Sequence, residues 1–442
     1  MDGKRVTELY NILADVPKID VHTHLTADRL MARGLDDILL YHMVNTELYS
    51  AGSPSGGRVP ETRSDEQAER RLEEAIPYLP QIRNTSMYWL VRLILADLYD
   101  WQGEVTSDNW RELHGRIKSL NREDGKRARE IMKILHIEKI GTEIVRRCDG
   151  RSDDIFEYAL EWAFFARTQW GQPDISLFEL ERAWNATGPE EPIPVTLQME
   201  DRPKLSRVIE TVEDIDAAVS HYCSLIPYGQ IKATAQHIST DIDYGRYSNS
   251  EVQAALDRRR EAGRQEQNVF SSRVLHTFLR ELEKRGDSIV FQFSIGAEAL
   301  PFESGMRLRQ ETIGQLAALV ASYPGLRFMC FNAGRHTHQS LCTLVRELPN
   351  LSLGGFWWHG FFPGAVHAMA EERLDMVPIN RQCDYMTDAY CMDWVYAKNR
   401  LILSQFARIF AEKLEMGQYG RQDIRAIAEG IFHDSAQELL GF

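Results

Sequence analysis

The sequence predicts an α/β fold, specifically a (β/α)8 TIM-type barrel with a helical insertion after its first strand. Eight short β-rich runs alternate with longer helical stretches, and this alternation is typical of parallel strands joined by right-handed crossovers. The chain has 442 residues, of which 43% are hydrophobic, enough for one large barrel with an insertion. More than a hundred residues separate the first two runs, which is too long for a simple crossover.

The candidate strands are spread over the whole chain. They are residues 19–22, 137–145, 193–199, 231–237, 288–294, 327–332, 351–357 and 383–388. Between the first two strands, helices are expected at 35–49, 65–79, 86–99 and 107–120, with a Gly-, Ser- and Pro-rich loop at 51–60.

These elements divide the chain into three parts. Residues 1–24 form an N-terminal helix and the first strand, 25–135 form a helical subdomain over the barrel mouth, and 136–442 complete the barrel. The polar stretch 241–267 is either a lid or a solvated helix, and the tail at 397–442 is amphipathic and closes the barrel.

Composition restricts the function. The formal charge of −14 argues against nucleic acid or an anionic membrane as the main partner, and no apolar run approaches the length of a membrane span. The six cysteines are scattered without a CxxC pair, at Cys148, Cys223, Cys330, Cys342, Cys383 and Cys391. We expect a reduced cytoplasmic protein that acts on a small molecule.

Two histidines separated by one residue end the first candidate strand. On a strand, positions i and i+2 point to the same side, so His22 and His24 can face one ion. Asp20 lies on that side as well and could brace an imidazole. Neutral imidazole is a good ligand for zinc and similar divalent metals. The alternative is a pair of surface or helix-capping histidines.

The ends of other strands supply further candidates, because chemistry in such barrels takes place at the C-terminal ends of the strands. Asp388 follows the last strand, and two histidines with one carboxylate suffice to hold a divalent ion. Asp388 could also move a proton, or it could simply cap a helix that begins at Ala389. His237 could be a ligand or an acid/base, or it could make an ordinary hydrogen bond.

Three more groups lie near strand ends. Arg335 could clamp a substrate carboxylate or hydroxyl, or form a structural ion pair. Trp357 and Trp358 could wall a sugar-like ligand, although adjacent strand residues face opposite ways and only one can point inward. His336 and His338 form a second pair, in a loop or helix start.

Several short motifs together resemble a known group of enzymes. They are Asp-Val-His-Thr-His-Leu at 20–25, Leu-Leu-Tyr-His at 39–42, Asn-Ala-Gly-Arg at 332–335, Gly-Phe-Trp-Trp at 355–358 and Thr-Asp-Ala at 387–389. In their order and spacing they resemble the amidohydrolase superfamily, and within it the uronate (glucuronate) isomerase branch.

The resemblance implies a fold, a reaction and a set of residues. Members are (β/α)8 barrels with a helical N-terminal insertion, and they interconvert an aldose uronate and a ketose uronate by moving a proton between C2 and C1 through an enediol. The implied metal ligands are His22, His24 and Asp388, with zinc as the expected ion, and His42 is implied to contact the substrate.

The sequence departs from the family pattern at three places. Met43 replaces an aromatic hydroxyl after the insertion histidine, Gln198 replaces an arginine on the third strand, and Tyr390 replaces an arginine after the last-strand aspartate. Gln198 and Tyr390 carry no positive charge, so Arg335 alone remains to bind a carboxylate. Tyr390 or His237 would then act as the missing proton carrier, on a sugar acid or a related polyol carbonyl.

Two other functions stay open. One is a mononuclear metal-dependent hydrolase, deaminase or lyase, with Asp388 as general base for a metal-activated water. Binuclear hydrolases normally carry more ligands at the positions that read His237, Ser294 and Asn332 here. The other is a sugar-acid-binding homologue that has lost catalysis. A homo-oligomer is plausible for any of these functions.

Overall fold

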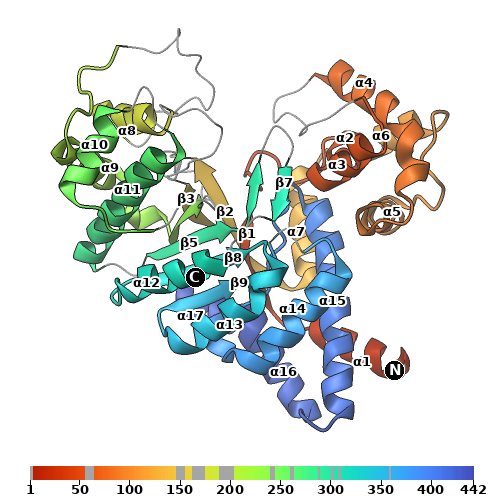
Figure 1. Ribbon diagram of the computed structural model, residues 1–442. Helices are drawn as coiled ribbons and strands as arrows, with labels where there is room; N and C mark the ends of the chain where they lie inside the picture. Colours follow the sequence, from red (N-terminus) through yellow and green to blue (C-terminus); the bar gives the residue numbers. More distant parts are fainter. Residues whose placement is uncertain are drawn as a thin grey trace. The chain divides into compact units, whose positions relative to one another are not determined.

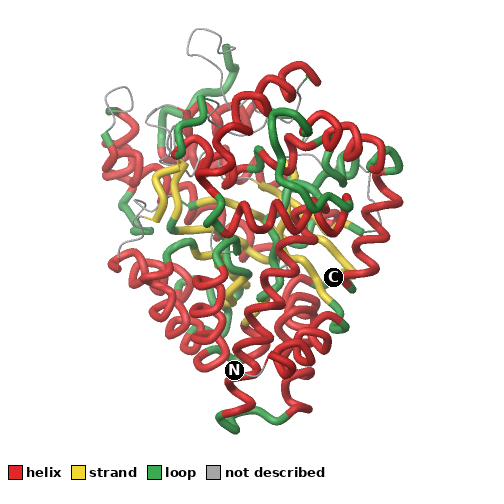
Figure 2. Tube along the Cα trace, turned by 90° about the vertical axis from the view of Figure 1, so that its right-hand side faces the viewer, coloured by secondary structure: helices red, strands yellow, loops and turns green. Residues whose placement is uncertain are grey.

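The computed structural model describes most of the chain. The described residues are 3–54, 64–145, 155–161, 175–188, 204–238, 244–258, 263–286, 289–299, 303–306, 310–357 and 360–442. Figure 1 shows the arrangement of the elements, and helices make up most of the described chain (Figure 2).

Eight strands form one sheet, in the order β1-β2-β3-β4-β5-β8-β9-β10. Their bounds are β1 Lys18–Thr23, β2 Ile137–Val145, β3 Phe156–Glu161, β4 Ala233–His237, β5 Val290–Ile295, β8 Arg327–Asn332, β9 Leu351–Gly354 and β10 Gln382–Cys383. The pairing is parallel between β1 and β2, from β3 through β5 and β8 to β9, and between β9 and β10. The predicted (β/α)8 class is confirmed.

The third strand differs from the prediction. The place between β2 and β4 is taken by β3, Phe156–Glu161, in which Phe156, Ala159 and Leu160 are buried. The predicted segment 193–199 lies outside the described residues. Several runs in this region have the apolar character of a strand, and pairing with distant residues decides which of them joins the sheet.

The other strands lie close to their predicted positions. Residues 137–145 and 327–332 match β2 and β8. The last strand is shorter than expected: β10 comprises two residues, and 384–388 continue as irregular chain. A small antiparallel hairpin that the sequence analysis did not include, β6 (Ala297–Ala299) and β7 (Glu303–Met306), follows β5.

The chain divides into two compact units. The first comprises Met1–Thr142, His359–Glu371 and Tyr385–His433, and the second comprises Glu143–Trp358, Glu372–Asp384 and Asp434–Phe442. These units are defined by compactness, so the predicted boundaries at residues 24 and 135 stay a prediction.

The first unit holds β1 and the whole of the predicted insertion, 25–135. Its helices are α1 Gly3–Ala14, α2 Leu35–Leu39, α3 His42–Ser50, α4 Asp65–Ala75, α5 Ser86–Tyr99, α6 Trp110–Leu120, α7 Asp124–Leu135, α15 Met392–Glu415 and α16 Arg421–Glu429. Helices α2 to α6 group together (Figure 1). The long helix α15 packs against α1 and α5. A capping box at Ser64 and Gln67 starts α4, which satisfies two backbone donors at the helix N-terminus.

The second unit holds the strands from β3 to β10. Its helices are α8 Ile175–Asn185, α9 Val212–Leu225, α10 Asn249–Asp257, α11 Arg264–Arg285, α12 Gln310–Ala321, α13 His338–Glu347 and α17 Ser435–Leu440, while α14, Pro363–Met376, belongs to both units. Helices α8 to α11 pack on one another over a core that includes Leu180, Val219 and Phe278. Of the predicted stretch 241–267, the described part contains α10 and the first turn of α11. Among the described residues, no helix has the length and apolar character needed to span a membrane.

Candidate metal centre

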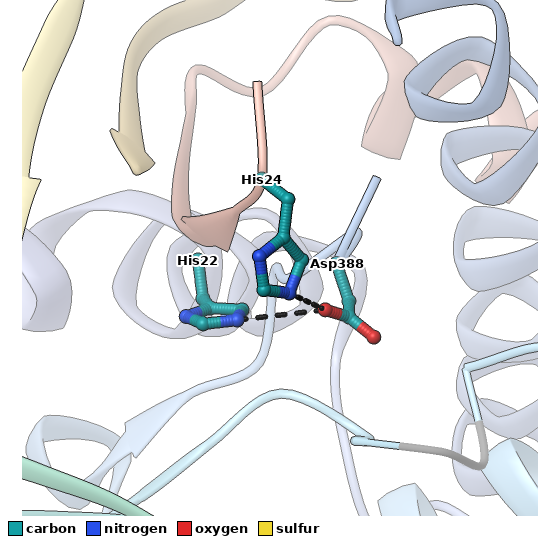
Figure 3. A group of neighbouring side chains, drawn as sticks. All are labelled: His22, His24 and Asp388. Carbon is teal, nitrogen blue, oxygen red and sulfur yellow. Dashed lines mark ion pairs between the residues drawn. The ribbon is translucent and has the colours of Figure 1, made fainter. Parts of the chain in front are cut away.

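The two histidines lie where the strand pattern predicts them. All six residues of β1 are buried, as expected of a parallel strand covered on both faces. His22 lies inside the strand and His24 one residue beyond its end. Both imidazoles point toward Asp388 (Figure 3).

The three side chains converge on one point. The Nε2 atoms of His22 and His24 lie 3.4 Å and 3.1 Å from the same oxygen, Oδ1 of Asp388, and the three donor atoms lie within 4.8 Å of one another. The side chain of His24 is 30% exposed and that of His22 only 7%. The centre is therefore open on the His24 side and closed behind His22.

The backbone of the last barrel segment aligns Asp388 with β1. The amide of Asp388 donates to His22 O at 3.0 Å, and the amide of His24 donates to Ala389 O at 2.8 Å. Helix α15 begins at Met392 with Cys391 as its N-cap, so Asp388 does not cap the following helix. The alternative interpretation of Asp388 as a helix cap is wrong.

Asp20 braces the backbone and not an imidazole. Its carboxylate accepts hydrogen bonds from the amide of Thr387 at 3.0 Å, the hydroxyl of Thr387 at 2.5 Å and the amide of His22 at 3.3 Å. Burial raises the pKa of Asp20 to about 6, against the lowering effect of the bonds from Thr387. Asp20 therefore links the first and last barrel segments, and the prediction that it contacts a ring nitrogen is wrong.

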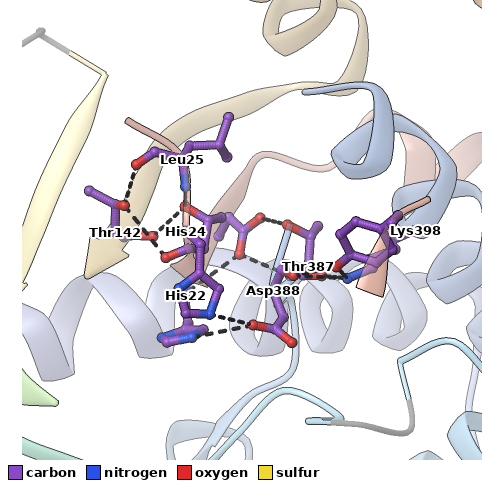
Figure 4. A network of polar contacts seen from close by, with 11 residues as sticks. His22, His24, Leu25, Thr142, Thr387, Asp388 and Lys398 are labelled. Atoms are coloured by element: carbon purple, nitrogen blue, oxygen red, sulfur yellow. Dashed lines mark hydrogen bonds and ion pairs between the residues drawn. The ribbon is translucent and has the colours of Figure 1, made fainter. Parts of the chain in front are cut away.

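Two threonines fix the chain around His24 (Figure 4). The hydroxyl of Thr23 donates to Gly141 O at 3.0 Å, and the hydroxyl of Thr142 donates to Leu25 O at 2.6 Å. Both residues are buried. Because the hydrogen bonds lie on either side of His24, they hold its backbone against β2.

Lys398 and Tyr41 also bind the segment that carries Asp388, and neither residue was predicted to belong to the site. Nζ of Lys398 donates to Tyr41 Oη at 2.9 Å, to Asp388 O at 3.0 Å and to Thr387 O, and Tyr41 Oη donates to Asp388 O at 2.8 Å. Burial lowers the pKa of Lys398 to about 7, and the negative charges of Asp388 and Asp20 oppose this. For Lys398, the sequence signal is a lysine within a largely apolar stretch of α15. Tyr41 stands in the motif at 39–42, to which only His42 contributed an implied role.

The charge of Asp388 is well supported. Burial by itself would raise its pKa, but the contacts with His22 and His24 and the charge of Lys398 hold the pKa well below its usual range. Asp388 is therefore a carboxylate at neutral pH. Within the described residues, Oδ1 has no polar partner other than the two ring nitrogens.

Two neutral imidazoles and one carboxylate are the donor set of many divalent-metal sites with open positions. A buried carboxylate oxygen that meets only imidazole nitrogens fits this set, because a cation among the three atoms would satisfy all of them. The residues therefore fit a divalent metal ion.

Tyr390 also lies at this centre. Its ring stacks on His24, with ring centroids 4.6 Å apart and the planes at 22°, and it meets the ring of Tyr41 edge-on. His42 begins α3 directly after Tyr41 and is half-buried, while Met43 is buried. The hydroxyl of Tyr41, the residue before His42, is hydrogen-bonded to Asp388 O, and the predicted substrate contact of His42 stays a prediction.

The remaining predicted residues belong to the second unit or lie outside the described residues. Arg335 is exposed at the start of a 3-10 turn, and among the described residues it makes no ion pair. Trp357 is half-buried beyond β9, and His237 is the last residue of β4. Gln198 and Trp358 lie outside the described residues. The roles proposed for these five residues stay predictions.

The second histidine pair does not form a metal site with the described residues. His336 is exposed, while His338 is fully buried and its Nε2 accepts from Arg373 Nε at 3.4 Å. The two side chains therefore face different surroundings, as expected of neighbours in a turn that leads into α13.

The fold and the three converging side chains together define a class, namely (β/α)8 proteins with a divalent-metal donor set at the ends of the first and last barrel segments. Uronate isomerase from Thermotoga maritima superimposes with a TM-score of 0.75 at 13% identity, covering 100% of this chain and 98% of that one. Glucuronate isomerase from Caulobacter crescentus gives a TM-score of 0.76 at 13% identity, covering 99% and 94%.

A third likeness is with a proposed metal-dependent hydrolase from Lactobacillus casei, with a TM-score of 0.58 at 10% identity, covering 98% and 97% of the two chains. No protein-family model matches the sequence, and no curated protein sequence matches it. The chain therefore has the uronate isomerase form of the (β/α)8 fold, as the sequence motifs predicted.

Proposed function

We propose that this protein is a metal-dependent isomerase of the uronate isomerase type, which interconverts an aldose and a ketose form of a sugar acid or a related polyol carbonyl compound. The observation that carries the proposal is the convergence of His22, His24 and Asp388 within 4.8 Å. The likeness over the full length to two uronate isomerases supports the reaction type.

His22, His24 and Asp388 would hold the metal ion. When bound, such an ion supplies polarisation of a substrate carbonyl or hydroxyl oxygen, and zinc is the ion we propose because imidazole suits it. Asp388, ionised at neutral pH, would accept or return a proton of the substrate. Its position beside the exposed face of His24 supports this role.

Tyr390 is the proposed second proton carrier, because its ring lies against His24 and a phenol can donate and accept a proton. His237, at the end of β4, is the alternative. For substrate binding we propose His42, Gln198, Arg335, Trp357 and Trp358. With Gln198 and Tyr390 in place of arginines, a less acidic substrate than a uronate is consistent with the proposal.

The cellular setting that we propose is a reducing cytoplasm. The five described cysteines are all free and buried, which is typical of proteins that do not depend on disulfides. The net charge of −14 supports a small-molecule substrate, without nucleic acid or membrane as a partner. A homo-oligomer also remains a proposal.

The test is exchange of substrate hydrogen with solvent. The metal-loaded protein is incubated in D2O with a panel of aldoses, ketoses and sugar acids, and NMR follows deuterium at C1 and C2. We expect exchange with at least one compound and loss of exchange in Asp388→Asn. The control is His433→Gln, which should keep full activity because the ring of His433 contacts Glu138 and is not part of the centre. If no compound exchanges although metal is bound, the isomerase assignment is wrong.

A mononuclear hydrolase, deaminase or lyase is the second candidate. The likeness to the proposed hydrolase from Lactobacillus casei and the open side of the centre at His24 favour it, because a metal-bound water could serve as nucleophile there. Release of ammonia, an acid or carbon dioxide from any substrate would identify this reaction class, because an isomerase releases none of them.

A further inference from the structure

Lys398 has a bonding arrangement that fits a positioning role in the metal centre. It projects from α15 and is 1% exposed. An ammonium group has three N–H donors, and each has an acceptor here: Tyr41 Oη, Thr387 O and Asp388 O. Two of the three acceptors are successive backbone carbonyls of the segment that carries the metal-ligating carboxylate.

Aromatic rings enclose this ammonium. Nζ lies 3.8 Å from the ring centroid of Phe361 and 5.1 Å from that of Tyr41, and Tyr41 in turn stacks on Trp394 at 4.3 Å. Cation–π contacts of this kind stabilise a cation that is away from water. The rings also fix the position of Tyr41 Oη, which donates to the Asp388 carbonyl as well.

Asp388 requires such support because its backbone is in the left-handed region, with φ of 49°. This conformation is uncommon for residues other than glycine. Aspartate and asparagine adopt it more readily than most, and local contacts stabilise it where it occurs. Here the Asp388 carbonyl accepts from both Lys398 and Tyr41, while its amide donates to His22 O. A relaxed backbone would turn the carboxylate away from the two histidines.

We propose that Lys398, together with Tyr41, is a positioning residue that holds the Thr387–Asp388 backbone in its left-handed turn and thereby sets the Asp388 carboxylate against His22 and His24. Figure 4 shows Lys398 beside Thr387 and Asp388. The inference rests on the proposed function of these three residues as metal ligands. The three N–H donors of Lys398 are directed to Tyr41 and to the two carbonyl groups, and none is directed to the Asp388 carboxylate. Lys398 acts through the direction of two carbonyl groups.

The experiment measures metal binding by the purified full chain, with Co²⁺ as the probe. Affinity is obtained by competition with a chelator, and the ligand geometry from the visible absorption spectrum of the Co²⁺ protein. We expect Lys398→Met to weaken Co²⁺ binding by about tenfold or more, the range typical for groups that orient metal ligands, and to change the spectrum. Tyr41→Phe keeps the ring stack and should give a smaller change in the same direction.

A matched control separates positioning from general stability. Phe410→Leu alters another fully buried side chain of α15, which packs against Phe406 and Tyr419. It should lower stability but leave the Co²⁺ affinity and spectrum unchanged.

Wild-type affinity and spectrum in Lys398→Met would overturn the inference. If Lys398→Met does not fold, Tyr41→Phe serves as the test. Wild-type Co²⁺ affinity and spectrum in Tyr41→Phe would then overturn the inference. Failure of the proposed function would look different, because wild type would then bind Co²⁺ no better than His22→Ala does.

Discussion

Individual buried side chains determine how the protein responds to pH, and His276 in α11 is a clear case. Its Nε2 contacts Tyr244 O at 2.9 Å and its Nδ1 contacts Tyr323 Oη at 2.7 Å. Burial lowers the pKa of His276, so the folded protein holds it neutral. Below its usual pKa of about 6.5, the unfolded chain binds a proton that the folded chain does not.

Stability should therefore fall as the pH drops from about 6.5 toward the lowered pKa, by up to about 1.4 kcal/mol per pH unit from this group. We expect His276→Gln to unfold at lower urea concentration at pH 8, but with a smaller loss of stability between pH 7 and pH 5 than wild type. Urea unfolding at several pH values measures this. Parallel stability curves for the two proteins would contradict the prediction.

Individual residues of the metal centre also differ in how well the sequence predicts them. The spacing of His22 and His24 predicted two ligands, because strand geometry depends only on neighbouring residues. Tyr41 and Lys398 were missed since they act on the backbone carbonyl of Asp388, and Tyr41 lies 347 positions away from it. Asp20 was placed on the correct side of its strand, but its partner, Thr387, was not visible in the sequence.

At the scale of elements, the centre depends on the close approach of β1 and β2. A Cβ atom added at Gly141 would lie 2.7 Å from Val21 O and 2.9 Å from Val21 C, both backbone atoms. Backbone in a paired strand cannot shift without breaking the hydrogen bonds around His24, such as that from Thr23 to Gly141 O. There is therefore no room for a side chain at position 141, and only glycine fits there.

Gly141→Ala should destabilise the protein by about 1–3 kcal/mol, the usual cost of overpacking, and weaken metal binding. Gly115→Ala is the matched control, because Gly115 is exposed inside α6 with nothing within 4 Å of the added Cβ. It should stabilise by about 0.4–1 kcal/mol. Urea unfolding of both variants tests the pair, and equal effects of the same sign would refute the argument.

Elements also differ in how well the sequence predicts them. Strands such as β2 and β8 were predicted correctly because a short apolar run between turn signals is compatible with few structures other than a buried strand. The third strand was misplaced because partner strands, and not local pattern, select β3. The last strand was predicted to be too long. Tyr385 and Asp388 make irregular hydrogen bonds with β1 in place of a regular ladder, and no local sequence pattern indicates this.

At the scale of the whole molecule, a ligand that binds the folded state and not the unfolded chain raises the free energy of unfolding. A metal ion at 100 times its dissociation constant should raise the free energy of unfolding by about 2.7 kcal/mol. We therefore expect Zn²⁺ or Co²⁺ to raise the melting temperature and EDTA to reverse the rise. Mg²⁺, which prefers oxygen ligands, should have a much smaller effect at the same concentration. Equal shifts with all three ions would indicate nonspecific binding.

The fold of the whole chain was predictable because eight alternating units leave few topologies, and the motifs at residues 20–25 and 387–389 indicated the uronate isomerase form. The substrate was not predictable in the same way. Among proteins that share a fold, specificity depends on individual side chains of the site, and one substitution can alter the charge of a site without altering the fold.

The most direct measurement is the metal content of the purified protein beside that of Asp388→Asn. Asparagine tolerates the left-handed backbone at this position but carries no charge, so this variant should fold with near wild-type stability. Elemental analysis after dialysis should find close to one divalent ion per wild-type chain and almost none in Asp388→Asn. Equal metal content in both proteins, or none in wild type after incubation with Zn²⁺, would contradict the assignment of His22, His24 and Asp388 as a metal centre.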